Sequence, residues 1–269
     1  MIKAVVTGAA GRMGSRIVNV LGTSEGIRLS GAVERKGHPL LGQDSNGPAG
    51  LPAGGVLTVI TDDLAAAIKA GDVLIDFTFP EISLEHLKLC ADLGKPVVIG
   101  STGFTKDQLD VVNTYVKKIP CVLSPNMSVG VNVCFKILAD IAKTLGEDFD
   151  VEIVETHHRM KKDAPSGTAV RMGEVVAKAL GRDYRQVARC HREGMVGERT
   201  KEEIGMQTLR GGDVIGEHTV YFIGMGERIE LTHRAHTRDM FARGAVRAAK
   251  WIVGKKPGLY DMQDVLGLK

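Results

Sequence analysis

Apolar residues recur with two different spacings through the first half of the chain, and the two alternate. Short runs rich in β-branched residues predict strands at 2–7, 27–34, 56–60, 73–77, 96–99 and 121–123. Between several of these runs, apolar residues at helical spacing predict helices at 12–21, 64–70, 84–93 and 106–117. Repeated strand–helix units predict a parallel sheet with helices on both faces. The segment 35–55 is rich in Gly and Pro and predicts a long surface loop.

The pattern changes after about residue 128. Apolar spacing predicts helices at 129–145 and 169–180, and alternation predicts a half-buried strand at 151–156. Further strands are predicted at 206–210, 218–223 and 228–233, followed by a helix at 241–253. Strands clustered in this way favour an antiparallel or mixed sheet. The sequence therefore predicts an α/β chain in which 1–127 and 238–269 form a parallel-sheet domain and 128–237 form an α+β domain with a mixed sheet.

Composition narrows the class of protein without naming it. The chain is 43% hydrophobic and 25% charged, which is typical of a globular protein, and its net charge of +3 argues against a nucleic-acid partner. No apolar stretch approaches the ~18 residues of a membrane span, and the N-terminus lacks the pattern of a signal peptide. The cysteines stand far apart, without a CxxC pair: Cys90, Cys121, Cys134 and Cys190. We therefore expect a cytoplasmic protein with free thiols and no membrane partner.

A glycine loop follows the first predicted strand and opens the first predicted helix. Its residues are Gly8, Ala9, Ala10, Gly11, Arg12, Met13 and Gly14. Small residues allow a pyrophosphate to approach the backbone, and a helix N-terminus offers unpaired N–H groups to it. Glu34 ends the second strand about twenty residues later, where a ribose-binding carboxylate belongs. This context favours a Rossmann-like dinucleotide site over an ordinary glycine-rich turn.

The cofactor and its nicotinamide side are predicted from residues at other strand ends. Glu34 favours the free ribose 2′-hydroxyl of NADH, whereas Arg35 suits the 2′-phosphate of NADPH, so we expect both cofactors to be used. A solvated loop charge remains an alternative for Arg35. Two loops that follow strands are candidates for the nicotinamide side, although ordinary turns would look the same: Gly100, Ser101 and Thr102, and Ser124, Pro125, Asn126 and Met127. For the strand end at 76–78, a packing role is favoured.

The segment 155–168 has the sequence Glu-Thr-His-His-Arg-Met-Lys-Lys-Asp-Ala-Pro-Ser-Gly-Thr. Five of the six residues from 157 to 162 can carry positive charge, and such a cluster is stabilised by an anion. The residues from Pro165 onward predict a helix start with exposed N–H groups. Together these features predict a receptor for carboxylates with proton donors beside it, rather than a solvent-facing basic loop. No metal site is expected, because adjacent His157 and His158 diverge on an extended chain.

This segment resembles the signature of the 4-hydroxy-tetrahydrodipicolinate reductase (dihydrodipicolinate reductase) family, Glu-x-His-His-x-x-Lys-x-Asp-Ala-Pro-Ser-Gly-Thr. Every fixed position of that signature is met. The likeness extends along nearly the whole chain and includes 8–14, 75–78, 100–104, 126–132, 192–194 and positions within 211–218. Two departures, Met127 for an aromatic residue and Ser101 for threonine, concern the cofactor side rather than the reaction.

The resemblance implies an enzyme that uses NADH and NADPH to reduce 4-hydroxy-tetrahydrodipicolinate, via dihydrodipicolinate, to tetrahydrodipicolinate in the diaminopimelate route to lysine. It implies that His157 is the acid/base residue and Lys161 a proton donor. The substrate carboxylates would be held by His158, Gly167 and Thr168, in the domain that also forms a homotetramer. The glycine loop, Glu34, Arg35 and the two strand-end loops would bind the cofactor.

Two other functions stay open from the residues alone. One is a dehydrogenase of another small acidic metabolite, which would share the glycine loop but would not need the cluster at 157–161 beside a helix start. The other is a nucleotide-sensing module, which would bind NADH without turning it over. A turnover assay with the cyclic dicarboxylate separates both from the reductase.

Overall fold

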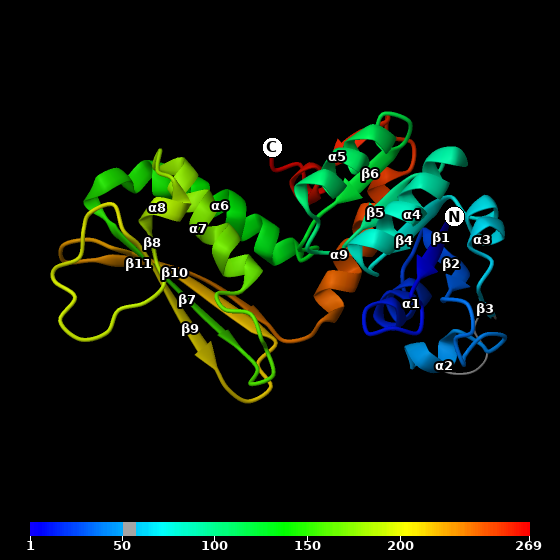
Figure 1. The fold of residues 1–269 in the computed structure, drawn as a ribbon, viewed down its shortest axis with the longest axis horizontal. Helices are drawn as coiled ribbons and strands as arrows, with labels where there is room; N and C mark the ends of the chain where they lie inside the picture. The colour runs from blue at the N-terminus through cyan, green and yellow to red at the C-terminus, as the bar shows by residue number, and fades with distance from the viewer. Residues whose placement is uncertain (51–57) are drawn as a thin grey trace. The chain divides into compact units, whose positions relative to one another are not determined.

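The structure, a computed structural model of the 269-residue chain, describes residues 1–50 and 58–269. Contacts divide the chain into two compact units (Figure 1). The discontinuous unit consists of Met1–Val129 and Arg238–Lys269, and the inserted unit consists of Gly130–Thr237. Their sheets confirm the predicted α/β class, with one parallel and one mixed sheet.

The discontinuous unit has a seven-stranded sheet in the order β12-β6-β5-β4-β1-β2-β3, with every neighbouring pair parallel. Its strands are β1 (Ile2–Thr7), β2 (Ile27–Val33), β3 (Ile60–Thr61), β4 (Val73–Asp76), β5 (Val97–Ile99), β6 (Pro120–Leu123) and β12 (Gly258–Tyr260). Its helices are α1 (Gly14–Gly22), α2 (Asn46–Ala49), α3 (Leu64–Ala70), α4 (Pro80–Asp92), α5 (Lys106–Tyr115), α9 (Asp239–Ile252) and α10 (Met262–Leu266).

Successive side chains of the central strands point to opposite faces of this sheet, and each face is covered by an apolar core. Ala4 and Val6 of β1 pack with α1, α9 and α10 on one face. Val5 packs with α3, α4 and α5 on the other. Both faces are therefore buried, which explains why the strands are nearly continuous apolar runs in the sequence.

Some elements of this unit differ from the prediction. The expected loop 35–55 is interrupted by α2 within its described part, and positions 51–55 lie outside the described residues. The strand expected at 56–60 also begins outside them, and its described part reaches β3 only at Ile60. The pattern after Pro257 predicted no element, whereas β12 extends the sheet beyond β6 and α10 follows it.

The inserted unit has a five-stranded sheet in the order β11-β10-β7-β9-β8. β10 is antiparallel to both of its neighbours, whereas β7, β9 and β8 are parallel. The strands are β7 (Asp150–His157), β8 (Ala188–Arg189), β9 (Ile204–Arg210), β10 (Gly216–Ile223) and β11 (Arg228–Ala235). The helices are α6 (Val129–Leu145), α7 (Gly167–Ala179) and α8 (Tyr184–Val187), with a 3-10 turn at Gly146–Asp148. The pattern had not predicted α8 and β8.

Strict alternation along β7 and β10 separates the two faces of this sheet. Buried and half-buried positions alternate along both strands, and the buried ones pack against α6 and α7. Glu155 and His157 occupy the last two buried positions of β7, where apolar residues would otherwise stand. The end of β7 therefore carries ionisable side chains on the helix-covered face.

Candidate active site

The loop between β1 and α1 requires glycine at three positions. Gly8 has a φ of 61°, a left-handed conformation that glycine adopts without strain. A Cβ on Gly14 would overlap the carbonyl oxygen of Gly8, and a Cβ on Gly11 would lie 3.0 Å from the same atom. The N–H of Gly11 donates to this carbonyl at 2.9 Å. The chain therefore doubles back tightly before α1 begins.

The start of α1 suits an anion. Met13 is the N-cap residue, its side chain makes no capping hydrogen bond, and the first turn contains no acidic residue. Unpaired N–H groups and the positive end of the helix dipole favour negative charge at such a terminus.

Glu34 follows β2, and its carboxylate lies beside the glycine loop. Its Oε1 accepts a hydrogen bond from the N–H of Ala10 at 3.0 Å, and its Oε2 accepts one from the N–H of Arg35 at 3.2 Å. Ala9 is buried, with its N–H donating to the carbonyl of Val33. Arg35 is exposed. The carboxylate is thus within hydrogen-bond reach of the loop, whereas the guanidinium of Arg35 lies at the surface.

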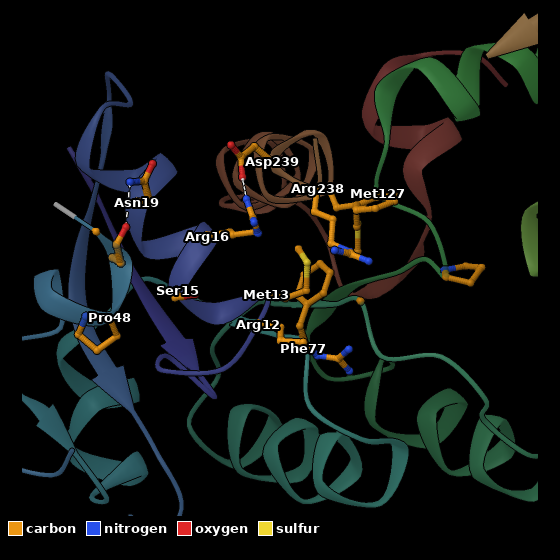
Figure 2. Close-up of a pocket in the computed structure, with 15 residues that line it drawn as sticks. Arg12, Met13, Ser15, Arg16, Asn19, Pro48, Phe77, Met127, Arg238 and Asp239 are labelled. Atoms are coloured by element: carbon orange, nitrogen blue, oxygen red, sulfur yellow. Dashed lines mark hydrogen bonds and ion pairs between the residues drawn. The ribbon is translucent and has the colours of Figure 1, made fainter. Parts of the chain in front are cut away.

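A cleft of about 710 Å³ opens beside this loop (Figure 2). Five residues expected to bind the cofactor line it: Arg12, Met13, Gly100, Pro125 and Met127. Arg16 of α1 and Arg238, which precedes α9, also line it, and Arg16 forms an ion pair with Asp239. A cleft of this size is in the range of small-molecule sites, and its three guanidiniums favour an anionic ligand.

The loop after β5 is shaped by an aromatic ring and a buried hydroxyl. A Cβ on Gly100 would overlap the ring of Phe77, so glycine lets this ring lie against the backbone and line the cleft. Ser101 is buried, and its Oγ forms a 2.7 Å hydrogen bond with the Oγ of Ser83. Thr102 is exposed. Of these three predicted residues, only Gly100 lines the cleft.

The loop after β6 is held by its own side chains. Ser124 donates from Oγ to the carbonyl of Asn126 at 2.9 Å, and the Oδ1 of Asn126 accepts from the N–H of Ser128 at 2.9 Å. Met127 is buried at the cleft. Ser124 and Asn126 therefore shape the loop, while Pro125 and Met127 face the cleft.

Asp76, at the end of β4, organises the neighbouring loop. It is fully buried, accepts hydrogen bonds at Oδ1 from the N–H and hydroxyl of Thr78 (2.8 and 2.6 Å), and lies 2.9 Å from the Nδ1 of His86 through Oδ2. Burial acts to raise the pKa of Asp76, but the bonds from His86 and Thr78 hold that pKa below its usual value. The contacts of Asp76 and Thr78 are internal to the loop and α4, as the favoured packing role predicts, whereas Phe77 between them lines the cleft.

In the inserted unit, the carboxylate of Glu155 contacts three side chains and one backbone N–H group. Its Oε2 lies 2.6 Å from the Nδ1 of His157 and accepts from the Nη1 of Arg210 at 2.7 Å. Its Oε1 accepts from the Nη2 of Arg210 at 2.8 Å, the N–H of Ser166 at 2.9 Å and the hydroxyl of Thr208 at 3.3 Å. The β7–β9 register places Arg210 directly beside His157.

The charges around these groups set their protonation. Burial acts to raise the pKa of Glu155, but hydrogen bonds from Arg210 and His157 hold it below its usual value, so the carboxylate is ionised at neutral pH. Burial lowers the pKa of His157, Lys161 and Arg210 lower it further, and Glu155 acts to raise it, with a net lowering. His157 is therefore neutral in the free protein at neutral pH.

Ser166 joins this cluster to the start of α7. It is the N-cap of that helix, with its Oγ accepting from the N–H of Ala169 at 3.2 Å. The same Oγ lies 2.9 Å from the Nε2 of buried His218, whose ring meets that of His157 edge-on, with 5.1 Å between centroids. Gly167 and Thr168 form the first turn of α7. The N-terminus of α7 thus lies next to the buried histidines.

Lys161 and His158 lie in the loop that leaves β7. The Nζ of Lys161 is 2.8 Å from both carboxylate oxygens of Asp163. Asp163 is exposed, and its carbonyl accepts from Arg210 at 2.7 Å, which joins the loop to the Glu155 cluster. The N–H of His158 donates to the carbonyl of Val214, and its side chain is half-buried. His157 and Lys161 thus belong to one network through Arg210 and Asp163.

Two further observations concern metals and membranes. Within residues 1–50 and 58–269, no three His, Cys, Asp or Glu side chains are grouped so as to hold a metal ion. Each helix in the described part of the chain is too short or too polar to cross a bilayer.

Family models cover almost the whole chain. The model described as dihydrodipicolinate reductase, N-terminus, matches residues 2–127, and the one described as dihydrodipicolinate reductase, C-terminus, matches residues 130–266. The chain belongs to the dihydrodipicolinate reductase family. The resemblance inferred from residues 155–168 is thereby confirmed.

Individual proteins agree with this family. The chain is 67% identical to the 4-hydroxy-tetrahydrodipicolinate reductase of Citrifermentans bemidjiense and 68% identical to that of Geotalea uraniireducens, in both cases over 100% of each chain. Among solved structures, it is similar to a dipicolinate-bound dihydrodipicolinate reductase from Paenisporosarcina sp. TG-14, with a TM-score of 0.76, 25% identity and 98% of each chain covered. An amine dehydrogenase from Mycobacterium smegmatis, at 16% identity and a TM-score of 0.59, shares the fold.

For this member of the dihydrodipicolinate reductase family, several residues around the two sites were given no role by sequence reasoning. In the inserted unit they are Glu155, Arg210 and His218. Glu155 had a usable signal, because residues two apart on a strand share a face with each other. Strand pairing brings Arg210 and His218 to the site, and the local sequence around them gives no signal of it. Arg16 and Arg238 line the same cleft although they lie at opposite ends of the chain, so their sequence neighbours do not indicate it either.

Proposed function

We propose that this chain catalyses the NAD(P)H-dependent reduction of 4-hydroxy-tetrahydrodipicolinate, via dihydrodipicolinate, to tetrahydrodipicolinate in the diaminopimelate route to lysine. The observation that carries the proposal is the cluster at the end of β7. There His157 lies buried beside Glu155, Lys161 is in the same network, and the first turn of α7 lies next to them. This arrangement combines proton donors with groups that attract carboxylates.

A reduced dinucleotide fits the discontinuous unit. The glycines at 8, 11 and 14 leave no Cβ in the turn, the N-terminus of α1 has no side-chain cap, and Glu34 lies beside the loop. The Gly8–Met13 loop and Arg238 would hold the pyrophosphate, Glu34 and Arg35 the adenosine ribose, and the loops at 100–102 and 124–127 the nicotinamide side. When bound, the cofactor supplies a hydride. We propose that both NADH and NADPH are used, with Arg35 at the surface to meet a 2′-phosphate.

The chain's own residues complete the reduction. The substrate is a cyclic imine with two carboxylates, and reduction of its conjugated C=C bond by hydride leaves an enamine-like carbon that must take up a proton. His157, acting through Nε2, and Lys161, acting through Nζ, would deliver this proton, which is supported by their place in one hydrogen-bond network. His158 and the N–H groups of Gly167 and Thr168 would hold the carboxylates, and their positive potential stabilises negative charge that develops in the transition state.

A substrate dicarboxylate also changes the protonation of the site. His157 is neutral in the free protein because it is buried and faces two cations. Two carboxylates bound beside it would raise its pKa, since they favour the charged ring. Binding of substrate thus prepares His157 as an acid.

A coupled assay that follows loss of the reduced nicotinamide, run with NADH and with NADPH, tests the proposal. His157→Gln should lower kcat by about 10²–10⁴-fold in a folded protein, because general acid help is worth that range. Lys161→Ala should lower both kcat and affinity for the dicarboxylate. Lys162→Ala, which removes an exposed neighbouring cation, is the matched control and should change neither. Unchanged kcat in His157→Gln would refute the assignment.

We further propose that the active form is a cytoplasmic homotetramer assembled through the inserted sheet. The helix-free face of this sheet exposes the apolar side chains of Leu209 and Ile223. Apolar side chains exposed on a sheet face are typical of association surfaces.

A further inference from the structure

Glu155 lies between a histidine and an arginine that come from two adjacent strands. We propose that Glu155 and Arg210 form a positioning pair that fixes the orientation and tautomer of His157. The inference rests on the proposed function of His157 in proton transfer, and neither Glu155 nor Arg210 need touch the substrate.

The hydrogen bonds allow one tautomer. Glu155 is ionised and can only accept, so the 2.6 Å contact with His157 requires a proton on Nδ1. The Nε2 atom is then the position that gains and loses a proton. An imidazole held at Nδ1 by a carboxylate is oriented as well as fixed in tautomer, as in catalytic triads.

Arg210 fixes the carboxylate in turn. Its Nη1 and Nη2 donate to Oε2 and Oε1 of Glu155 at 2.7 and 2.8 Å, a two-point contact that defines the plane of the carboxylate. The N–H of Ser166 and the hydroxyl of Thr208 also donate hydrogen bonds to Oε1. Glu155 is 1% exposed, so this geometry is held away from water. Rotation of the carboxylate would break several bonds together, and His157 is therefore rigidly placed.

The same unit contains a second two-point Glu–Arg ion pair, whose carboxylate does not hold a histidine ring. Arg192 donates to Glu152 from two nitrogens at 3.0 and 2.7 Å and also pairs with buried Glu203. This pairing ties the segment before β9 to β7. It supplies a control for the cost of breaking a half-buried Glu–Arg pair when no proton-transfer residue depends on it.

The groups that face His157 predict opposite effects for the two partners. Glu155 on its own strand acts to raise its pKa, whereas Lys161 in the following loop and Arg210 on β9 act to lower it. The ring of His218 on β10 meets the His157 ring edge-on, and His233 on β11 acts to lower the pKa of His218. Asp163 lies beside Lys161 and Arg210. Without Glu155, the neighbouring cations should lower the pKa of His157. Without Arg210, the carboxylate of Glu155 should raise it.

The test is an NMR titration of the free, full-length protein labelled with 15N-histidine, with the His157 signals assigned by their absence in His157→Gln. Glu155→Gln should lower the pKa of His157 and abolish the predominance of the Nδ1–H tautomer. Arg210→Met should raise that pKa. In the coupled assay, both variants should lose kcat on the order of 10²-fold with a smaller change in the substrate KM, because the ring is misplaced rather than removed. Arg210→Lys keeps the charge but not the two-point contact and should restore the pKa but only part of kcat.

Glu203→Gln and Arg192→Met are the matched controls and should leave both the His157 titration and kcat close to wild type. The proposal is overturned if the two site variants shift the His157 pKa in the same direction or not at all, or if the controls lose as much kcat. Should Glu155→Gln fail to fold, Arg210→Met and Arg210→Lys carry the same test. Because the titration needs no turnover, pKa shifts in the expected directions with no change in kcat would instead refute the role of His157 in catalysis.

Discussion

Gly216, the first residue of β10, lies against the Nε2 edge of His157 and allows a sharp test of the proposed role of this histidine. A Cβ on Gly216 would lie 2.9 Å from the Nε2 of His157 and 3.3 Å from its Cδ2. Ordinary carbon contacts begin at about 3.5 Å, so Gly216→Ala must displace the ring by about half an ångström. Glu155 holds the other side of the ring at 2.6 Å, so the ring cannot retreat without stretching that bond or leaving its rotamer.

We expect Gly216→Ala to lower kcat by about 10- to 100-fold, because displacements of up to about 1 Å cost up to 10²-fold. The free energy of unfolding should fall by only about 1–3 kcal/mol, the usual cost of overpacking. Steady-state kinetics at saturating cofactor give kcat, and urea unfolding gives the stability.

The matched control is Gly224→Ala, just beyond the far end of β10. Its Cβ would lie 2.8 Å from the ring of Phe149, so it also crowds an aromatic ring, but at a distance from His157. The two variants should lose similar stability, and only Gly216→Ala should lose turnover. Wild-type kcat in Gly216→Ala, or an equal loss in Gly224→Ala, would refute the reasoning.

Two more predictions concern the glycine loop and a buried histidine. Gly14→Ala should raise the KM for the reduced dinucleotide at least about 10-fold but leave the dicarboxylate KM unchanged, because the new Cβ would meet the backbone of Gly8 and Ala9. Gly47→Ala is the control, since a Cβ there would enter open space. Equal effects of the two variants on the dinucleotide KM would contradict the assignment. Burial lowers the pKa of His218 to about 3, so between about pH 6.5 and pH 3 the unfolded chain binds a proton that the folded chain does not, and stability falls as pH falls through that window. His218→Gln should reduce the pH slope of the unfolding free energy by about 1.4 kcal/mol per pH unit in urea titrations, and an unchanged slope would be the contrary result.

Much of the fold was predictable because its elements are long and periodic. The predicted ends of β1, α3 and α6 coincide with those in the structure, and each has a clear apolar spacing. The helices and strands without a prediction are short: β8 has two residues, β12 three, α2 and α8 four each, and α10 five. Such elements are too short to show a period, and tertiary contacts such as the pairing of β12 with β6 define them.

The site was predictable where its residues are adjacent in sequence. His157, Lys161 and the start of α7 fall within one segment, so their chemistry could be inferred without a fold. Arg210 was not predictable in this way, because its place beside His157 depends on the parallel register of β7 and β9. The pattern also gave no sign that Ser101 bonds to Ser83 instead of facing the cleft, since a hydroxyl has no preferred partner until packing is known.

The split of the discontinuous unit has a consequence for synthesis on the ribosome. Residues 130–237 emerge before 238–269. The inserted unit therefore has all of its strands while the discontinuous unit still lacks α9, β12 and α10. Until α9 emerges, the apolar face that includes Ala4, Val98 and Val122 lacks a main part of its cover. The nascent chain therefore carries an unfinished hydrophobic surface through the translation of more than a hundred residues, and chaperone binding in that interval would protect it from aggregation.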